Sequence, residues 1–355
     1  MNDVEELKEY LLVHARIQGI GPRRYREIVA GISSDTPFKP DSWTARWSEE
    51  GRSLERSGRL LEACRCYNLA RFPFVDGPAR KQALDDCVAT FDRWRAAGTG
   101  LEPLTVSWSD GQVRCWAGGL SASERRPLVL LSGGTVSIKE QWAPLLPLFL
   151  EQGFAAIALE MPGVGQNSIR YTPEAWQMLP AILDAVADRA DVDRTFAICL
   201  SFSGHLALRA AGADPRIRGI ITAGAPVRRF FTDAGWRQRV PRIATDTLEH
   251  LTGEPVDDMS RWALDDRTLD AVRIPVHYLI SRRDEIVPPA EAEVLRAHIP
   301  GLRTLANNDV HGSPRRVLES RIWVLRSLLG LRGGNRVRRT ALSGALGLLR
   351  LLRNH

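Results

Sequence analysis

The sequence has few of the features that mark secreted, metal-binding or membrane-spanning proteins. Its 355 residues include only five cysteines, an odd number that argues against a disulfide framework and favours a reduced, cytoplasmic protein. No apolar run approaches the roughly 18 residues of a membrane span. Residues 1–6 are polar and acidic, so we expect no signal peptide. Cys64 and Cys66 lie too close together for the usual metal spacing, and we expect neither a metal nor a cofactor.

Lysine is also scarce, since it supplies only four of the 48 basic residues. The net charge of +6 arises at one end of the chain, because residues 331–355 hold six arginines and no acid. The rest of the chain carries as many acidic as basic residues, so we expect no nucleic-acid-binding face. What remains is an ordinary globular composition, 44% hydrophobic and 25% charged.

Residues 1 to about 100 have the apolar periodicity of helices. No copy of this pattern recurs at the period of a repeat protein, which indicates one helical unit rather than a solenoid. Helices are expected at about 4–17, 23–30, from a cap at Asp41 onward, 58–70 and 78–97.

From about residue 101 to 330, short apolar strands alternate with helices. This alternation predicts an α/β fold with a mostly parallel central sheet flanked by helices. Residues 227–272 are too long for a simple crossover and are expected to form a helical cap insertion. Strands are expected at about 104–108, 112–117, 127–132, 154–159, 195–200, 218–223, 275–281 and 302–306. Helices are expected near 138–151, 173–189, 203–212, 289–298 and 314–329.

One strand-to-helix junction has a serine at its tightest point. Residues 196–200 are strand-like, Gly204 opens an Ala- and Leu-rich helix, and Ser201 lies between them. In a nucleophile elbow, G-x-S-x-G, such a serine projects above the sheet and its neighbours must be small. Here Cys199 and Ser203 replace the glycines, and both are still small. The alternative is an ordinary junction in which the serine caps the helix.

Two later strand ends carry the partners that a nucleophilic serine needs. The strand at 275–281 leads to Asp284 and Glu285, and the last strand leads to His311. Serine, acid and histidine thus follow the order of an α/β-hydrolase triad. We predict that His311 accepts the proton of Ser201 while Asp284 orients the imidazole. Asp284 fits the D-x-I-V-P pattern better than Glu285 does, but Glu285 stays an alternative for the acid. The acid and the histidine could also be ordinary loop residues without a catalytic role.

An oxyanion on the substrate would need two backbone N–H donors. We expect one from Phe202, which follows the serine. The other is expected from Thr135, because the preceding Gly133-Gly134 pair lets the backbone approach a substrate closely. The tight turn at 160–165 is interpreted as structural.

The remaining histidines lack a strand-end position and are interpreted as structural. His205 follows the serine by four residues and is expected to pack on its own helix. The others are His14, His250, His277, His298 and His355.

Three segments of the chain resemble the FrsA-like α/β-hydrolases. This group includes 2,6-dihydroxypseudooxynicotine hydrolase and the fungal Ayg1-type polyketide-shortening enzymes. Residues 133–140 match the G-G-x-x-S-x-K-E segment of these proteins, and residues 161–165 match their P-G-x-G turn. Residues 67–74 resemble their lid-forming segment. The resemblance covers about residues 40–330, and the chain departs from it at the elbow, where the family has glycines.

The resemblance implies an α/β-hydrolase core at 101–330 beneath an N-terminal helical lid at 1–100. It also implies roles for Ser201, Asp284 and His311 as nucleophile, acid and base. Such enzymes hydrolyse esters or cleave a C–C bond beside a ketone. We therefore expect a serine hydrolase for a medium-sized substrate, such as a polyketide of secondary metabolism.

Two other interpretations stay open. The scaffold could catalyse a non-hydrolytic elimination or cyclisation of a polyketide, with His311 as general base. It could also be a binding protein with a degenerate site, which the missing elbow glycines permit. A fluorophosphonate probe would separate a nucleophilic serine from a binding-only site.

Residues 331–355 form a basic C-terminal tail. Leucines at 342, 346, 349 and 352 give one apolar helical stripe. We expect this stripe to dock on the protein's own surface or on a second copy, which would give a homodimer. The alternative is an interfacial helix on anionic lipid, which Gly344 and Gly347 disfavour. We therefore expect no stable association with a membrane. Besides a second copy of the chain, the expected partner is a small-molecule substrate.

Overall fold

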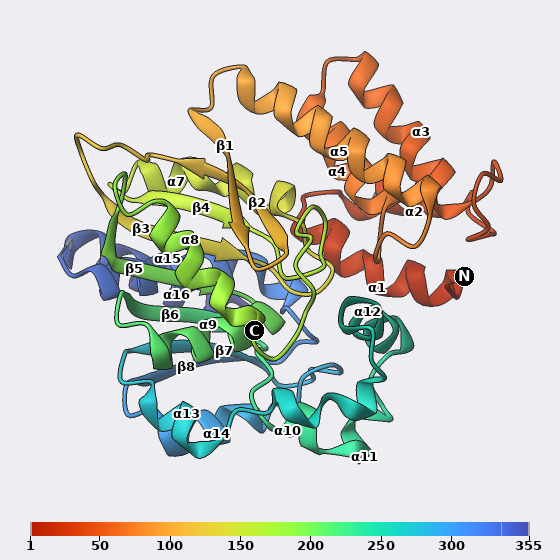
Figure 1. The fold of residues 1–355 in the computed structure, drawn as a ribbon. Coiled ribbons are helices and arrows are strands. Elements are labelled where there is room, and N and C mark those ends of the chain that lie inside the picture. Colours follow the sequence, from red (N-terminus) through yellow and green to blue (C-terminus); the bar gives the residue numbers. More distant parts are fainter. Residues whose placement is uncertain (1, 335, 354–355) are drawn as a thin grey trace.

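A mixed eight-stranded sheet runs through the centre of the molecule (Figure 1). The computed structural model describes residues 2–334 and 336–353. The strands are β1 (Leu101–Trp108), β2 (Gly111–Gly118), β3 (Pro127–Ser132), β4 (Ala155–Leu159), β5 (Asp191–Cys199), β6 (Ile217–Ala223), β7 (Val276–Ser281) and β8 (Leu302–Asn307). Their order is β1-β2-β4-β3-β5-β6-β7-β8, with β1, β2 and β4 antiparallel neighbours and the rest parallel.

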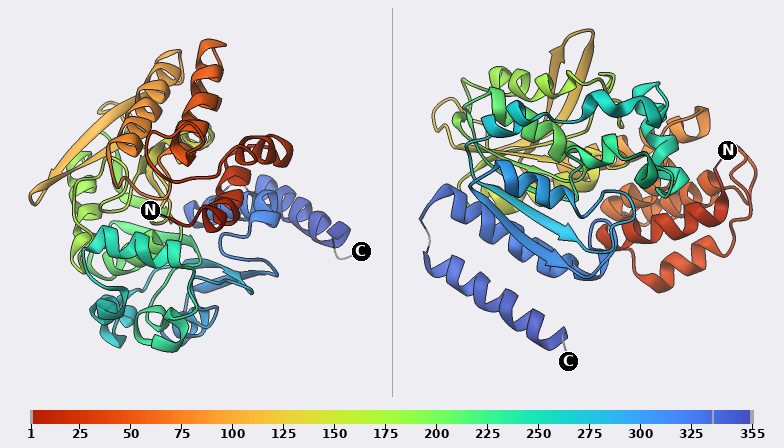
Figure 2. Two further views of the ribbon diagram at one scale, coloured as in Figure 1. Left: turned by 90° about the vertical axis from the view of Figure 1, so that its right-hand side faces the viewer. Right: turned by 90° about the horizontal axis from the view of Figure 1, so that it is seen from below.

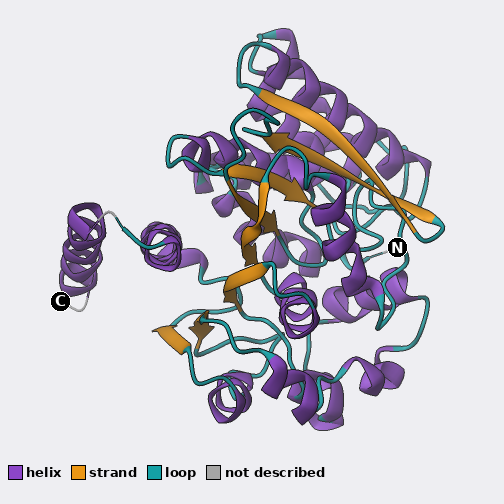
Figure 3. Ribbon diagram, turned by 60° about the vertical axis from the view of Figure 1, so that its left-hand side comes forward, coloured by secondary structure: helices purple, strands orange, loops and turns teal. Residues whose placement is uncertain are grey.

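Helices cover both faces of this twisted sheet, which confirms the predicted α/β-hydrolase architecture (Figure 3). Every residue of β3 and β4 is buried, as expected for central strands covered on both sides. The flanking helices are α6 (Lys139–Trp142), α7 (Leu146–Leu150), α8 (Met178–Ala185), α9 (Phe202–Ala213), α13 (Asp266–Ala271), α14 (Glu291–His298) and α15 (Val317–Arg332).

Two expected helices are shorter than the sequence pattern indicated. The segment expected as one helix at 138–151 is α6, a 3₁₀ turn η1 (Ala143–Leu145) and α7. Pro144 stands in the first turn of η1 and Pro147 in the first turn of α7, where the missing backbone N–H breaks no helical hydrogen bond. The helix expected at 173–189 is a 3₁₀ turn η2 (Ala175–Gln177) followed by α8, which ends at Ala185.

The N-terminal region is helical and lies over one edge of the sheet (Figure 1). Its helices are α1 (Val4–Ile17), α2 (Pro22–Val29), α3 (Trp43–Arg56), α4 (Leu60–Ala70) and α5 (Pro78–Ala96). Trp43 and Trp47 of α3 are fully buried in the core of this region. The expectation that Asp41 caps α3 is wrong, because Ser42 is the N-cap residue and its hydroxyl accepts from the Ala45 amide at 3.3 Å.

The segment after β6 folds as a series of short helices. They are α10 (Arg229–Thr232), α11 (Ala234–Arg237), α12 (Arg242–Thr252) and the 3₁₀ helix η3 (Val256–Trp262), with α13 completing the insertion. The buried Glu291 carboxylate fixes the start of the insertion, accepting from the amides of Val227 and Phe230 at 3.0 and 2.9 Å. This arrangement agrees with the helical insertion expected for 227–272.

The last helix that the structure describes, α16 (Arg336–Arg353), lies beside α15 on the outside of the molecule (Figure 2). The η4 turn (Pro314–Arg316) precedes α15. Arg326 donates to the Ser343 hydroxyl at 2.6 Å, and Arg350 donates to the Ala306 carbonyl at 2.8 Å. Among the described helices, none is both long and apolar enough to cross a membrane.

Candidate active site

Ser201 occupies a strained turn between β5 and α9. Its φ of 57° lies in the left-handed region, a conformation that costs a non-glycine residue about 1–3 kcal/mol. Its amide donates to the Ala223 carbonyl at 2.8 Å, which holds the turn against β6. Although Ser201 stands at the N-cap position of α9, its side chain makes no capping hydrogen bond. The hydroxyl is therefore available to another partner, and the turn has the geometry of a nucleophile elbow.

The elbow forms without its usual glycines because the position that requires glycine is Gly204, one residue after Ser203. A Cβ built on Gly204 would lie 2.2 Å from the Thr222 Oγ1 of β6. Ser203 fits beside it, and its hydroxyl donates to the Leu200 carbonyl at 2.9 Å. Cys199 is buried at the end of β5. The small side chains of Cys199 and Ser203 are therefore compatible with the tight turn.

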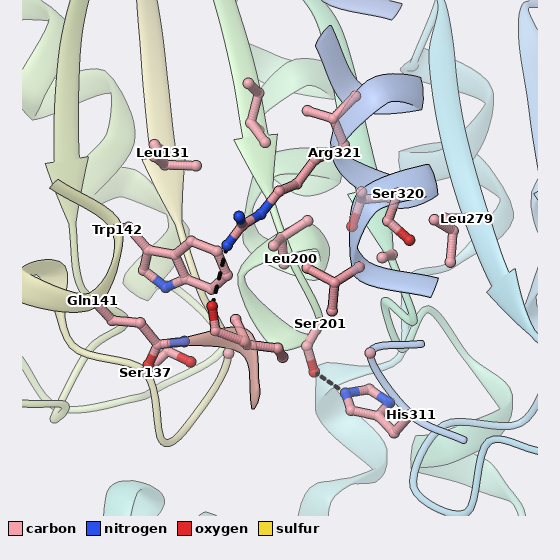
Figure 4. Close-up of a pocket in the computed structure, with 18 of the residues that line it drawn as sticks. Leu131, Ser137, Gln141, Trp142, Leu200, Ser201, Leu279, His311, Ser320 and Arg321 are labelled. Atoms are coloured by element: carbon pink, nitrogen blue, oxygen red, sulfur yellow. Dashed lines mark hydrogen bonds between the residues drawn. The ribbon is translucent and has the colours of Figure 1, made fainter. Parts of the chain in front are cut away.

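The structure brings the three predicted side chains together in a hydrogen-bonded chain, of which Figure 4 shows the Ser201–His311 pair. The Ser201 Oγ lies 3.0 Å from the His311 Nε2. The His311 Nδ1 lies 2.9 and 2.8 Å from the two carboxylate oxygens of Asp284. Asp284 follows β7 and His311 follows β8, so each side chain comes from the carboxyl end of a parallel strand.

The Asp284 carboxylate determines the proton arrangement of this chain. A carboxylate accepts only, so Nδ1 of His311 carries the proton and its Nε2 is left to accept from the Ser201 hydroxyl. Burial lowers the pKa of His311, but the charge and hydrogen bond of Asp284 outweigh burial and hold the pKa above its ordinary value. The backbone amides of Ile286 and Val287 donate to Asp284 Oδ1 at 3.0 and 2.8 Å and fix the carboxylate.

Glu285, the acid that the sequence left open, has a different contact. Its Oε2 accepts from the backbone amide of His311 at 3.0 Å. It therefore holds the histidine loop, whereas Asp284 contacts the imidazole. The neighbouring Gly224, with a φ of 56°, leaves room for both, since a Cβ there would lie 2.8 Å from His311 Cε1.

The loop after β3 approaches the serine closely. A Cβ on Gly134 would lie 2.9 Å from the Ser201 Cβ and 3.1 Å from its Oγ. The Thr135 and Phe202 amides donate to no other residue in the described part of the chain. The Phe202 amide is also at the first position of α9, where helix amides lack internal partners and the helix dipole is positive. Both amides are thus free for the oxyanion role that the sequence predicted.

A buried ion cluster supports this loop. The Lys139 Nζ lies 2.8 Å from Glu140 Oε1 and 3.5 Å from Glu160 Oε1. Trp116 donates to Glu140 Oε1 at 2.9 Å, and Glu160 accepts from the Lys139 amide at 3.2 Å. Burial raises the pKa of Glu160 to about 7, although the Lys139 charge opposes this. The sequence named Lys139 and Glu140 only as part of a family motif. The structure places Lys139 in contact with both Glu140 and Glu160, and Glu160 begins the turn at 160–165.

Arg71 connects the helical region to the same loop. Its buried guanidinium donates to the carbonyls of Val136 and Pro73 and to the Asn68 Oδ1. Asn68 in turn donates to the Gln18 side chain at 2.8 Å. Burial lowers the pKa of Arg71 to about 10, so the side chain still carries its charge at neutral pH. Sequence reasoning missed this contact, because nothing local links α4 to the loop after β3.

Ser201 and His311 open into a cavity of about 330 Å³ that α1 covers. Tyr10 and His14 of α1 line it, with ring centroids 5.8 Å apart. Within the described residues, neither side chain makes a hydrogen bond. Burial, followed by the charge of Arg71, lowers the pKa of His14 to about 3, so its imidazole is neutral at pH 7. The interpretation of His14 as merely structural overlooked this position, since only the packing of α1 over the sheet creates it.

The other histidines lie away from the serine. Nε2 of the buried His205 donates to the Trp262 carbonyl at 2.7 Å, consistent with the structural role expected for it. His250 stacks on Phe74 at 4.3 Å, and His298 contacts Asp270 at 2.9 Å. His277 packs near Trp323, whereas His355 lies outside the described residues. No metal-binding group of three or more His, Cys, Asp or Glu side chains occurs among the residues that the structure covers.

Comparisons with known proteins agree with this architecture. Residues 41–288 match the family described as esterase FrsA-like. The esterase FrsA of Photobacterium profundum is 22% identical over 271 residues, 67% of this chain and 65% of that protein. The Vibrio cholerae protein of the same name is 23% identical, over 68% of this chain and 66% of its own length. The chain thus matches slightly less than two thirds of the length of these curated relatives.

Two solved structures extend the similarity to nearly the whole chain. AbyA5 is 49% identical with a TM-score of 0.94, covering 98% of this chain and 100% of that one. The 2,6-dihydroxy-pseudo-oxynicotine hydrolase shares the fold at 16% identity, with a TM-score of 0.67 over 94% of this chain and 95% of that one. The family match covers well over half of the chain, and the fold agrees with it. The chain belongs to the FrsA-like esterase family of the α/β-hydrolase superfamily.

Proposed function

We propose that this protein is a serine hydrolase in which Ser201, His311 and Asp284 are nucleophile, general base and orienting acid. The observation that carries the proposal is the continuous hydrogen-bonded chain, 3.0 Å from Ser201 to His311 and 2.8 Å from His311 to Asp284. These side chains come from three separate strand ends, and each pair is within the reach that proton transfer needs.

The reaction follows from this geometry. Nε2 of His311 takes the proton of Ser201 as its Oγ bonds to the substrate carbonyl carbon, and the carbonyl electrons move to oxygen. The amides of Thr135 and Phe202 then stabilise that oxyanion. As the tetrahedral intermediate collapses, the protonated His311 gives its proton to the leaving group. Water, deprotonated by the same imidazole, releases the acyl group and restores Ser201.

The bond that is broken is an ester, or a C–C bond beside a ketone. For C–C cleavage the leaving group departs as a carbanion and takes the proton from His311. A β-diketone or an acylphenol stabilises such a carbanion, so these are the substrates proposed for that reaction. The lining of the cavity, largely Leu, Ile, Val and aromatic side chains, supports a medium-sized, mostly apolar molecule such as a polyketide. The five free, buried thiols support cytoplasmic action.

Comparison of wild type with Ser201→Ala and His311→Ala tests the proposal. Candidate aryl esters and polyketides are incubated with each protein and the products are followed by mass spectrometry. We expect both variants to lose about three or more orders of magnitude in kcat with unchanged thermal melting. Product formation by folded Ser201→Ala at the wild-type rate would instead favour elimination or cyclisation with His311 as base, since its Nε2 faces the same cavity. A wild-type protein that turns over no substrate and is not labelled by a fluorophosphonate at Ser201 would favour the binding-protein alternative.

A further inference from the structure

The cavity does not end at the serine but continues along one face of the sheet (Figure 4). Leu131 of β3, Ile198 of β5 and Leu279 of β7 line it from the sheet, and all three are buried. Figure 4 places Ser201 and His311 at one end and Leu131 and Arg321 farther along. The result is a channel that begins at the proposed nucleophile.

Helices on the two sides complete this channel. Phe149 of α7 lines it from one side, and Val324 and Leu325 of α15 line it from the other. Leu148 marks its outer end, because it lines the cavity and is 51% exposed. Arg321 is the one residue with a permanent charge among the described lining residues, and its guanidinium donates to the carbonyl of Ile17, another lining residue, at 3.1 Å. Most of the lining side chains between the serine and the surface are apolar, and the Ile17 carbonyl accepts a hydrogen bond from the one charged group among them.

Ser320 of α15 keeps part of the channel open because its side chain is small. Its side chain lines the channel, and its buried Oγ has no hydrogen-bond partner in the described part of the structure. A small residue on this helix leaves open a space that a larger side chain would fill. The whole cavity has a volume of about 330 Å³, which corresponds to about ten water-sized groups of ~30 Å³ each.

We propose that this channel binds a flexible aliphatic chain of the substrate, attached to the carbonyl that Ser201 attacks. The assignment rests on the proposed function, since it takes the serine as the point of reaction. A chain in the channel removes apolar surface from water on both partners, so each added methylene strengthens binding by about fourfold until the channel is full. A substrate without such a chain leaves the apolar walls unused.

Binding of straight-chain methyl ketones to full-length Ser201→Ala tests the channel without turnover. The probes are 2-heptanone, 2-nonanone and 2-undecanone, whose carbonyl has the polarity of the scissile group. Trp142 and Trp323 line the cavity, so their fluorescence reports binding. We expect Kd to fall about 16-fold for each pair of added methylenes while room remains. Equal Kd values for the three ketones would overturn the proposal.

Ser320→Phe in the Ser201→Ala background places a ring in the channel. We expect Ser320→Phe to weaken the binding of 2-undecanone by tenfold or more and to abolish the dependence of Kd on chain length. Ser320→Ala should retain that dependence. Leu318→Phe is the matched control, because Leu318 lies on the same helix but is 53% exposed and does not line the cavity. An equal loss of affinity for all three ketones in Ser320→Phe would show that Ser320 lies only at the entrance of the cavity, and this would contradict the proposal.

A second variant tests the outer end if Ser320→Phe does not fold. Leu148→Trp should weaken only the longest ketone, and an unchanged length series would count against the channel. Fluorophosphonate labelling of wild type separates the two proposals. Labelled Ser201 with no length dependence rejects the channel alone, whereas length-dependent ketone binding without labelling rejects the nucleophile alone.

Discussion

Gly134 lies so close to Ser201 that a Cβ on the glycine would stand 2.9 Å from the serine Cβ and 3.1 Å from its Oγ. The loop after β3 and the elbow after β5 therefore meet at the reacting oxygen. We predict that Gly134→Ala lowers kcat/KM by about two orders of magnitude, because the methyl displaces either the hydroxyl or the Thr135 amide. Steady-state kinetics with an aryl ester measures this.

The control for Gly134→Ala is thermal unfolding of the same protein. The methyl would press on the Ser201 Cβ, which is not the end of a flexible side chain, so we expect a lower melting temperature but a cooperative transition that shows a folded protein. Wild-type kcat/KM in Gly134→Ala would show that the loop does not form the oxyanion site.

The two neighbouring acids provide a second prediction. Asp284→Asn should lower kcat by about three to four orders of magnitude, because an amide does not hold the Nδ1–H tautomer of His311. Glu285→Gln should cost far less, since its amide oxygen can still accept from the His311 backbone. Kinetics of both variants measure the ranking, and the opposite order would place the acid role on Glu285.

The pH dependence of kcat/KM provides a third prediction. The general base must be neutral, and the pKa of His311 lies above its ordinary value of 6.5 because Asp284 outweighs burial. Activity should therefore rise with pH through a midpoint above 6.5. In Asp284→Asn the opposing charge is gone, so the residual activity should have its midpoint at lower pH. A wild-type midpoint below 6.5 would be inconsistent with this arrangement.

The sequence predicted the strands, the α/β order and the three side chains that the structure joins by hydrogen bonds, because each rests on a local signal. Residues 276–281 form a largely buried strand, and an acid or histidine just past such a strand lies at the sheet edge. His14 had no such signal, since its place in the cavity depends on how α1 packs over strands far along the chain. Arg71 was missed for the same reason. Asp41 and Ser42 were equally good caps by composition, and only the backbone path distinguishes them.

The C-terminal helix provides a fourth prediction. Leu348, Leu351 and Leu352 of α16 are 59%, 65% and 66% exposed, so its docking on α15 leaves an apolar face uncovered. We predict that full-length protein self-associates through this face and that deletion of residues 334–355 gives a monomer with unchanged activity. The deletion keeps Arg332, whose guanidinium stacks 4.8 Å from the Phe154 ring centroid. Sedimentation velocity measures the change.

Vesicle binding is the control for the tail. Full-length and truncated protein are sedimented with anionic vesicles at physiological salt. We expect no tail-dependent co-sedimentation, because Gly344 and Gly347 weaken an isolated helix. Co-sedimentation that requires the tail would assign it to a lipid surface instead.

Labelling with a fluorophosphonate, read by intact mass and peptide mapping, tests the central claim most directly. An activated serine attacks phosphorus and displaces fluoride, which adds one phosphonyl group. The account predicts one adduct per chain, located on Ser201, absent from Ser201→Ala and formed at least about a thousand times more slowly in His311→Ala. An unlabelled wild type, or an adduct that persists in Ser201→Ala, would contradict the assignment of Ser201 as the nucleophile.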